Sequence, residues 1–203
     1  MVSELKIFKF MTTIERTHKD IIQGTKKHII EVARQLFSKY SYLGVSMSDI
    51  AKKLNITKAA LYYHFTGKTE IYKKVLDKVF NNLEECIKKA LKEKSDRKKL
   101  YLFIKNYLDF GFEEKNFIKT IALKLPFADT KIKKYILDLK QKHINLLASL
   151  IKNITKKKKG QSEMMAFLLI EMMNGLILEQ SYRDKRFDSK KLGADIISCF
   201  VLN

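Results

Sequence analysis

Apolar residues recur every three or four positions along most of this chain, which is the spacing of helices that bury one face. The pattern, with its charged and proline breaks, predicts about nine helices, over 25–40, 47–54, 58–65, 68–91, 98–112, 116–125, 129–154, 161–182 and 189–202. The helix over 68–91 keeps its spacing without a break and should form one continuous rod. The lysine-rich tract 155–160 is expected to be a solvated loop. We therefore predict an all-α fold.

Composition agrees with a helical fold. The 203 residues include a single proline, seven glycines and no tryptophan, which argues against a turn-rich β-sandwich. Hydrophobic residues make up 46% of the chain, enough for one small and one larger buried core. The N-terminus lacks an apolar stretch of signal-peptide length, and the most apolar window, 164–178, is too short to span a membrane. We expect a cytoplasmic protein with no membrane partner.

The two cysteines and the net charge are less informative about function than the helical pattern. Cys86 and Cys199 are far apart and lie at no metal-ligand spacing, so reduced thiols, no metal and no cofactor are expected. The chain carries 41 basic and 22 acidic residues, a formal net charge of +19, which favours polyanion binding. The lysines are spread over the whole length, including 156–159, so a general lysine bias explains much of this charge equally well.

Residues 46–68, SMSDIAKKLNITKAALYYHFTGK, have the layout of two short helices joined by a tight turn, with another helix beginning at once. Ser46 is positioned to cap the first helix, and Asp49 three residues later is its capping-box partner. Thr57 is positioned to cap the second helix. In that helix Leu61 and Phe65 repeat the four-residue spacing of a buried seam. The other side chains of this helix are free to enter a DNA groove, as in a helix-turn-helix.

The string S-x-S-D-I-A-x-x-L-x-I-T-K-A-A-L-Y-Y-H-F-x-x-K over these residues resembles the signature of the tetracycline-repressor (TetR) family of bacterial and archaeal transcription regulators. The resemblance covers roughly 25–75, because the upstream stripe of Ile30, Ala33, Leu36 and Phe37 also agrees. The family commonly has glycine where this chain has Ser41, and serine tolerates a left-handed backbone less well, so we expect a slightly different cap there.

Residues 1–24 form a polar arm, in which Met11 is either an alternative start or an ordinary residue of a flexible arm. The resemblance implies a three-helix helix-turn-helix DNA-binding domain over 25–70 and a helical ligand-binding and dimerisation domain over 71–203. It also implies a homodimer. We expect helices 161–182 and 189–202 to pair with their symmetry mates, because Phe167, Leu168, Ile170, Ile177, Leu178, Ile196, Ile197, Phe200 and Val201 exceed what one face of each helix can bury.

Ten residues are candidates for DNA contact. Ser46 and Thr57 are expected to use their side chains for capping and to offer only a backbone N–H to phosphate. Alanines can contact thymine methyls but cannot make bidentate hydrogen bonds to a base, so direct readout should be sparse. In similar proteins, a lysine at the position of Lys68 binds the DNA backbone, whereas Ser48 stands where a basic residue is common. The remaining candidates are Lys58, Ala59, Ala60, Tyr62, Tyr63 and His64; the alternative for Tyr62 is partial packing inside the domain.

A second set of candidates lies in the C-terminal part and could line a ligand cavity or could simply be core. The methionine-rich helix is apolar nearly all round, so it must bury more than one face, and methionine packs around varied shapes. A polar anchor for a ligand would come from His143, Asn174 or Glu171. The candidate lining residues are Tyr107, Phe110, Phe117, Phe127, His143, Met164, Met172 and Asn174.

These patterns predict a ligand-responsive transcription regulator, a repressor by resemblance, that binds a palindromic double-stranded operator as a homodimer and releases it on binding a hydrophobic small molecule. Two alternatives remain open: a constitutive helix-turn-helix DNA-binding protein with a solid dimerisation bundle, and an enzyme carrying a helix-turn-helix. The sequence has no glycine-rich phosphate loop, nucleophile elbow or metal cluster, so we expect no enzyme.

Overall fold

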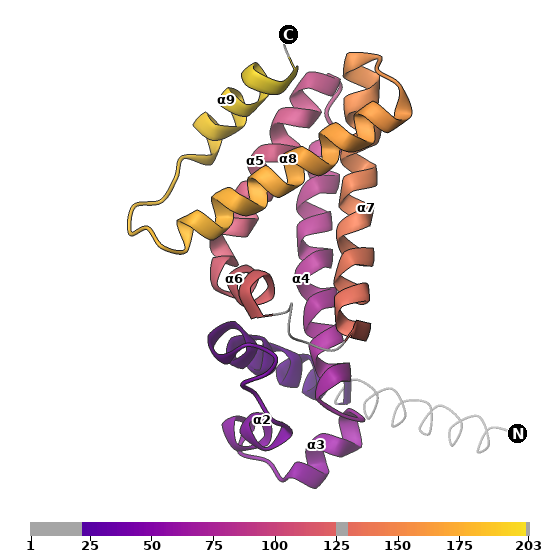
Figure 1. Ribbon diagram of the computed structural model, residues 1–203. Helices are drawn as coiled ribbons and strands as arrows, with labels where there is room; N and C mark the ends of the chain where they lie inside the picture. Colours follow the sequence, from indigo (N-terminus) through magenta and orange to yellow (C-terminus); the bar gives the residue numbers. More distant parts are fainter. Residues whose placement is uncertain (1–21, 125–129, 202–203) are drawn as a thin grey trace, which may run out of the picture.

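The structure, a computed structural model, describes residues 22–124 and 130–201, which form nine helices and no strand (Figure 1). The first helix covers 22–40. It is followed by α2 (Met47–Leu54), α3 (Lys58–His64), α4 (Lys68–Leu91), α5 (Asp96–Glu113), α6 (Lys115–Lys124), α7 (Thr130–Thr155), α8 (Lys159–Gln180) and α9 (Ser189–Val201). The predicted all-α fold is confirmed, and each helix lies within a few residues of its predicted bounds. Most of the predicted arm, Pro126 and the candidate Phe127 lie outside the described residues.

The loop predicted over 155–160 is too long, because Lys159 and Gly160 already belong to α8. The side-chain oxygen of Gln161 accepts a hydrogen bond from the Lys158 backbone N–H at 3.4 Å, which satisfies a donor at the helix start. None of the described helices is both long and apolar enough to cross a membrane.

Two buried cores share α4. The lower core joins helix 22–40, α2, α3 and the first half of α4, and it also takes in Phe117 from α6 and Ile132 and Ile136 from α7. The upper core joins the end of α4 with α5, α7, α8 and α9. Figure 1 shows α4 running from the helix-turn-helix at one end into the bundle at the other. At 1.5 Å per residue its 24 residues span about 36 Å.

Helix α8 approaches α5 closely where they cross. A Cβ added at Gly111 of α5 would lie 2.1 Å from Ile177 Cδ1, so a larger residue here would force the Ile177 side chain to move. The crossing buries Ile170 and Ile177 of α8, and Ile196 and Ile197 of α9 are also buried inside the chain. The expectation that these four residues are surplus for dimerisation is therefore wrong.

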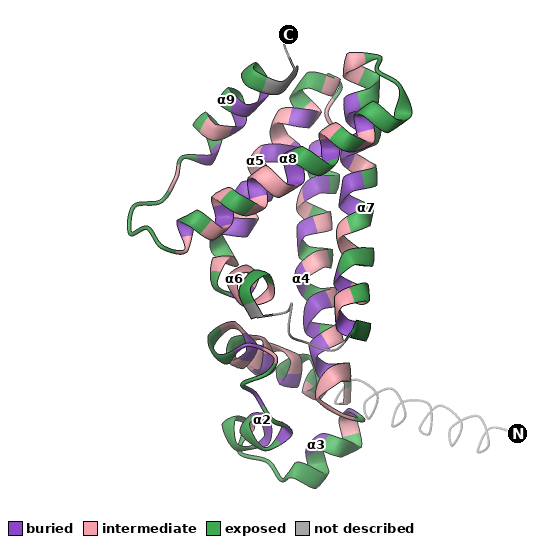
Figure 2. Cartoon of the chain, viewed as in Figure 1, coloured by how far each residue is buried: buried purple, intermediate pink, exposed green. Residues whose placement is uncertain are grey.

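The large apolar side chains of α8 that remain exposed lie on its outer face instead. Met164, Phe167 and Leu168 are between 46% and 59% exposed, and Tyr182 just beyond the helix is 61% exposed. Figure 2 shows exposed and buried positions alternating along α8. The side chains of Phe200 and Val201 lie outside the described part of the structure.

Ser41 ends the first helix in the left-handed conformation, with a φ of 65°. Its backbone N–H bonds the Phe37 carbonyl at 2.9 Å, as the residue after a helix does in a left-handed cap. The different cap expected for serine is therefore wrong, since the serine adopts the backbone that glycine would favour.

Candidate DNA-binding surface and ligand pocket

The two short helices of the helix-turn-helix are held by local caps, as predicted. The Ser46 hydroxyl accepts from the Asp49 backbone N–H at 3.2 Å, and the Asp49 carboxylate accepts from the Ser46 N–H at 2.8 Å. Asn55 ends α2 in the left-handed region with a φ of 55°, which asparagine tolerates better than most residues. The Thr57 hydroxyl accepts from the Ala60 N–H at 3.0 Å and starts α3. These contacts fix where α2 begins and ends and where α3 begins.

Helix α3 is anchored by few side chains and presents the rest outward. Leu61 is fully buried, and Phe65 directly after the helix is 3% exposed. Tyr63 is 72% exposed and Tyr62 47%, so Tyr62 packs only in part. Lys58, Ala59 and Ala60 are exposed along the same helix, as is Ser48 on α2. In Figure 2, α3 forms the exposed end of the molecule.

His64 and Lys68 differ from their exposed neighbours. The imidazole of His64 is half-buried, packs edge-on against Tyr63 at 5.1 Å between ring centroids, and keeps a buried Nδ1 with no hydrogen-bond partner among the described residues. The Lys68 ammonium donates to the Tyr42 carbonyl at 2.9 Å and lies 4.4 Å from the centre of the Tyr42 ring. Burial lowers the pKa of Lys68 from its ordinary value. An ammonium has three donors, so two remain for a phosphate.

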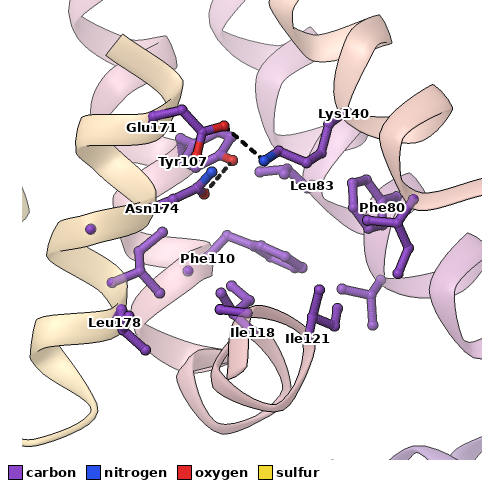
Figure 3. A pocket seen from close by; sticks show the side chains of 16 residues that line it. Phe80, Leu83, Tyr107, Phe110, Ile118, Ile121, Lys140, Glu171, Asn174 and Leu178 are labelled. Atoms are coloured by element: carbon purple, nitrogen blue, oxygen red, sulfur yellow. Dashed lines mark hydrogen bonds and ion pairs between the residues drawn. The ribbon is translucent and has the colours of Figure 1, made fainter. Parts of the chain in front are cut away.

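An apolar pocket of about 450 Å³ lies in the bundle, between α4, α5, α6, α7 and α8 (Figure 3). Two polar contacts are set into its wall: the Tyr107 hydroxyl donates to Asn174 Oδ1 at 2.9 Å, and Lys140 Nζ lies 2.7 Å from Glu171 Oε1. Burial raises the pKa of Tyr107, which keeps the phenol protonated. The lining residues are Val79, Phe80, Leu83, Tyr107, Phe110, Gly111, Ile118, Ile121, Ala122, Ile136, Lys140, Glu171, Asn174, Gly175, Ile177 and Leu178.

The structure brings together only some of the predicted lining residues. Tyr107, Phe110 and Asn174 line the pocket. Phe117 packs instead in the lower core, with its ring 6.2 Å from that of Tyr72. His143 is buried behind the pocket wall, its ring stacked on Phe80 at 5.7 Å.

The two methionines among the predicted lining residues lie elsewhere. Met172 is half-buried against the upper core, and Met164 lies on the outer face of α8. Lining residues from α4 and α6, such as Phe80, Ile118 and Ile121, were missed. Their only sequence signal is apolar spacing, which does not separate a pocket wall from solid core.

The fold and the two sites together define a helix-turn-helix protein in which one long helix leads into a pocket-bearing helical bundle. Residues 29–75 match the family described as bacterial regulatory proteins, tetR family. The resemblance over 46–68 is thus confirmed.

Curated relatives with higher identities match a short segment of the chain. The biofilm operon negative transcriptional regulator IcaR of Staphylococcus epidermidis is 48% identical over 56 residues, 28% of this chain and 30% of the relative. IcaR of Staphylococcus aureus is 45% identical over 62 residues, 33% of its length. The chain thus matches about a third of the length of these curated relatives.

Most of the chain resembles solved structures in fold. The TetR-family regulator PfmR of Thermus thermophilus is 20% identical with a TM-score of 0.69, over 86% of this chain and 97% of that chain. FadR of Bacillus subtilis, solved with stearoyl-CoA, is 16% identical with a TM-score of 0.72, over 85% and 96%. At such identities the comparison establishes the shared architecture.

Proposed function

We propose that this protein is a transcriptional repressor that binds a palindromic operator as a homodimer and releases it when an apolar small molecule occupies the bundle. The observation that carries the proposal is the capped helix α3, which is anchored by Leu61 and Phe65 and exposes its other side chains at one end of the molecule. A helix presented in this way fits the major groove of DNA.

The direction of regulation is supported by the relatives. IcaR, which is 48% identical to this chain over 56 residues, is named a negative transcriptional regulator. A ligand response is supported by the pocket of about 450 Å³, because a bundle that served only for dimerisation needs no such cavity. The pocket therefore favours the ligand-responsive alternative over the constitutive one, and FadR, with a similar fold, was solved in complex with stearoyl-CoA.

A second copy of the chain is the partner that we propose for the outer face of α8. Met164, Phe167 and Leu168 are large apolar side chains grouped on one face, and a two-fold interface would remove them from water. Changing Phe167 to Glu should then produce monomers at micromolar concentration by light scattering. Leu137 on α7, which is 62% exposed, supplies the control, since Leu137→Glu should leave the dimer intact.

The proposal as a whole is tested by selecting duplexes from a random pool with the full chain. We expect enrichment of palindromes whose half-sites lie about one helical turn, roughly 34–36 Å, apart, bound by two protomers. Unselective binding by a monomer would contradict the proposal. Release of the selected duplex by apolar compounds, measured by fluorescence anisotropy, tests the ligand response separately.

A further inference from the structure

The polar groups of the pocket gather at one end. Figure 3 shows Glu171, Lys140, Tyr107 and Asn174 close together. The rest of the labelled wall is apolar and consists of Phe80, Leu83, Phe110, Ile118, Ile121 and Leu178. Glu171 and Asn174 are three residues apart on α8, so they lie on the same face of that helix. A ligand that fills this space therefore meets an apolar surface and, at one end, two polar pairs.

In the first pair, Tyr107 and Asn174, the amide nitrogen of Asn174 remains as an unused neutral hydrogen-bond donor. The Tyr107 phenol is buried and protonated, and it donates its only hydrogen to Asn174 Oδ1. A side-chain amide has two N–H donors in addition to its oxygen. With Oδ1 engaged and oriented by Tyr107, the amide nitrogen of this pocket-lining residue is available to an acceptor in the cavity.

The second pair makes a charged ligand unfavourable. Lys140 and Glu171 are each about one-third exposed and already neutralise one another at 2.7 Å. An anionic ligand that formed an ion pair with Lys140 would leave the Glu171 carboxylate unpaired beside it. A cationic ligand that paired with Glu171 would leave the Lys140 ammonium unpaired. Removing one partner of a partly buried ion pair costs more than keeping the pair intact. An uncharged ligand leaves the pair undisturbed.

We propose that the effector is an uncharged molecule with an apolar body and a carbonyl-type acceptor that receives a hydrogen bond from Asn174. This inference rests on the proposed ligand response and specifies the chemical class of its ligand. The donor gives selectivity, because an analogue without the acceptor displaces water from the amide and does not replace its hydrogen bond.

Four naphthalenes of similar shape test the inference: 2-acetylnaphthalene, the hydrocarbon 2-ethylnaphthalene, the anion 2-naphthoate and the cation 2-naphthylmethylammonium. Binding to the full chain is measured by calorimetry, and release of a bound operator duplex by anisotropy. The ketone should bind at least about tenfold more tightly than either ion, the ratio that corresponds to about 1.4 kcal/mol.

Two variants isolate the amide. Tyr107→Phe retains Asn174, whereas Tyr107→Phe with Asn174→Leu removes the donor without leaving a buried phenol unpaired. The ratio of ketone to hydrocarbon affinity should fall by about tenfold from the unchanged chain to the second variant, which is the size expected for one hydrogen bond. Tyr107→Phe alone frees the amide to turn and should give a ratio between these two. Retained hydrocarbon binding in both variants shows that the pocket is still folded.

Two results would overturn the inference. One is an affinity ratio that is the same in the unchanged chain and in the second variant, and the other is tighter binding of naphthoate than of the ketone that is lost in Lys140→Met. If all four compounds bound alike and released the operator, the proposed ligand response would stand. The inference that the effector needs a hydrogen-bond acceptor would then be refuted. If none bound, the ligand response and the inference would fail together.

Discussion

Arg34 and Glu114 form a two-point ion pair between the DNA-binding end and the bundle. Arg34 Nη1 lies 3.1 and 2.9 Å from the two carboxylate oxygens of Glu114. Arg34 also bonds Glu31, whose other carboxylate oxygen accepts from Lys78 of α4 at 2.6 Å. Hydrogen bonds from Arg34 and Lys78 lower the pKa of Glu31 to about 2. Helix 22–40, α4 and the α5–α6 junction are thus tied by one network of charges.

This pair should couple ligand binding to the position of the DNA-binding end. Glu114 directly precedes α6, and Ile118 and Ile121 of α6 line the pocket. We expect Glu114→Gln to reduce the effect of an apolar ligand on operator affinity, because the contact that transmits movement of α6 is weakened. The measurement is operator affinity with and without ligand. If the ligand changed the operator affinity of Glu114→Gln as much as that of the unchanged chain, the Arg34–Glu114 pair would not couple the pocket to the DNA-binding end.

The same pair should contribute to stability. A double-mutant cycle with Arg34→Met and Glu114→Gln should give a coupling energy of about 1 kcal/mol in urea unfolding, because both side chains are largely shielded and hydrogen-bonded. Lys159 and Glu163, an exposed pair at i,i+4, provide the control. The double-mutant cycle on this exposed pair should give a coupling energy of only about 0.3 kcal/mol.

Lys68 and Tyr63 should affect DNA binding in different ways. Lys68→Ala should weaken binding to all duplexes alike and reduce the salt slope by about 1, because a phosphate contact carries no sequence information. Tyr63→Ala should change the sequence preference, because this side chain projects from α3. Anisotropy titrations against a selected duplex and a random one over a salt series measure both effects. Lys92→Ala, at the opposite end of α4, removes the same charge and should change neither.

Ser41→Gly should stabilise the protein by about 1 kcal/mol. Serine at a φ of 65° bears a steric cost that glycine avoids, and left-handed backbone costs an ordinary residue about 1–2 kcal/mol. Urea unfolding of the full chain measures the gain. Asn55→Gly, at a φ of 55°, is the comparison, and its effect should be smaller because asparagine tolerates this region. Equal effects at both sites would argue against strain at Ser41.

His143 should make the protein less stable in acid. Burial lowers its pKa from 6.5 to about 4; Lys142 acts in the same direction and Glu84 opposes it. Above pH 6.5 the imidazole is neutral in both folded and unfolded chains, so it adds no pH dependence. Between pH 6.5 and about 4 the unfolded chain binds the proton more readily, and stability falls as pH falls, by up to about 3 kcal/mol. His143→Phe, which can keep the stacking on Phe80, should flatten this part of the unfolding profile; an unchanged profile would assign the acid sensitivity to other groups.

The helix-turn-helix could be predicted from the sequence because its signals are local. Ser46, Asp49 and Thr57 act on backbone groups within three residues, so their spacing alone indicates the caps. The seam of Leu61 and Phe65 is likewise a property of one short segment. A resemblance to a known family then added the expected arrangement of the following helices.

The pocket could be predicted only in part, because its wall depends on how distant helices cross. The close approach at Gly111 buries Ile177, which by sequence alone was indistinguishable from an interface residue. Phe110 and Phe117 are both aromatic and lie on neighbouring helices, yet one lines the pocket and the other fills the lower core. Apolar spacing identifies residues that leave water, while tertiary packing decides whether they meet a cavity or another side chain.

The way in which α3 is anchored has an evolutionary consequence. Its place in the fold depends on Leu61, on Phe65 just after it and on the cap at Thr57, whereas most of its other side chains contact little of the protein. Substitutions at those outward positions therefore cost little folding free energy. Among descendants of one ancestral gene, the DNA sequence that is recognised can diverge rapidly while the fold persists.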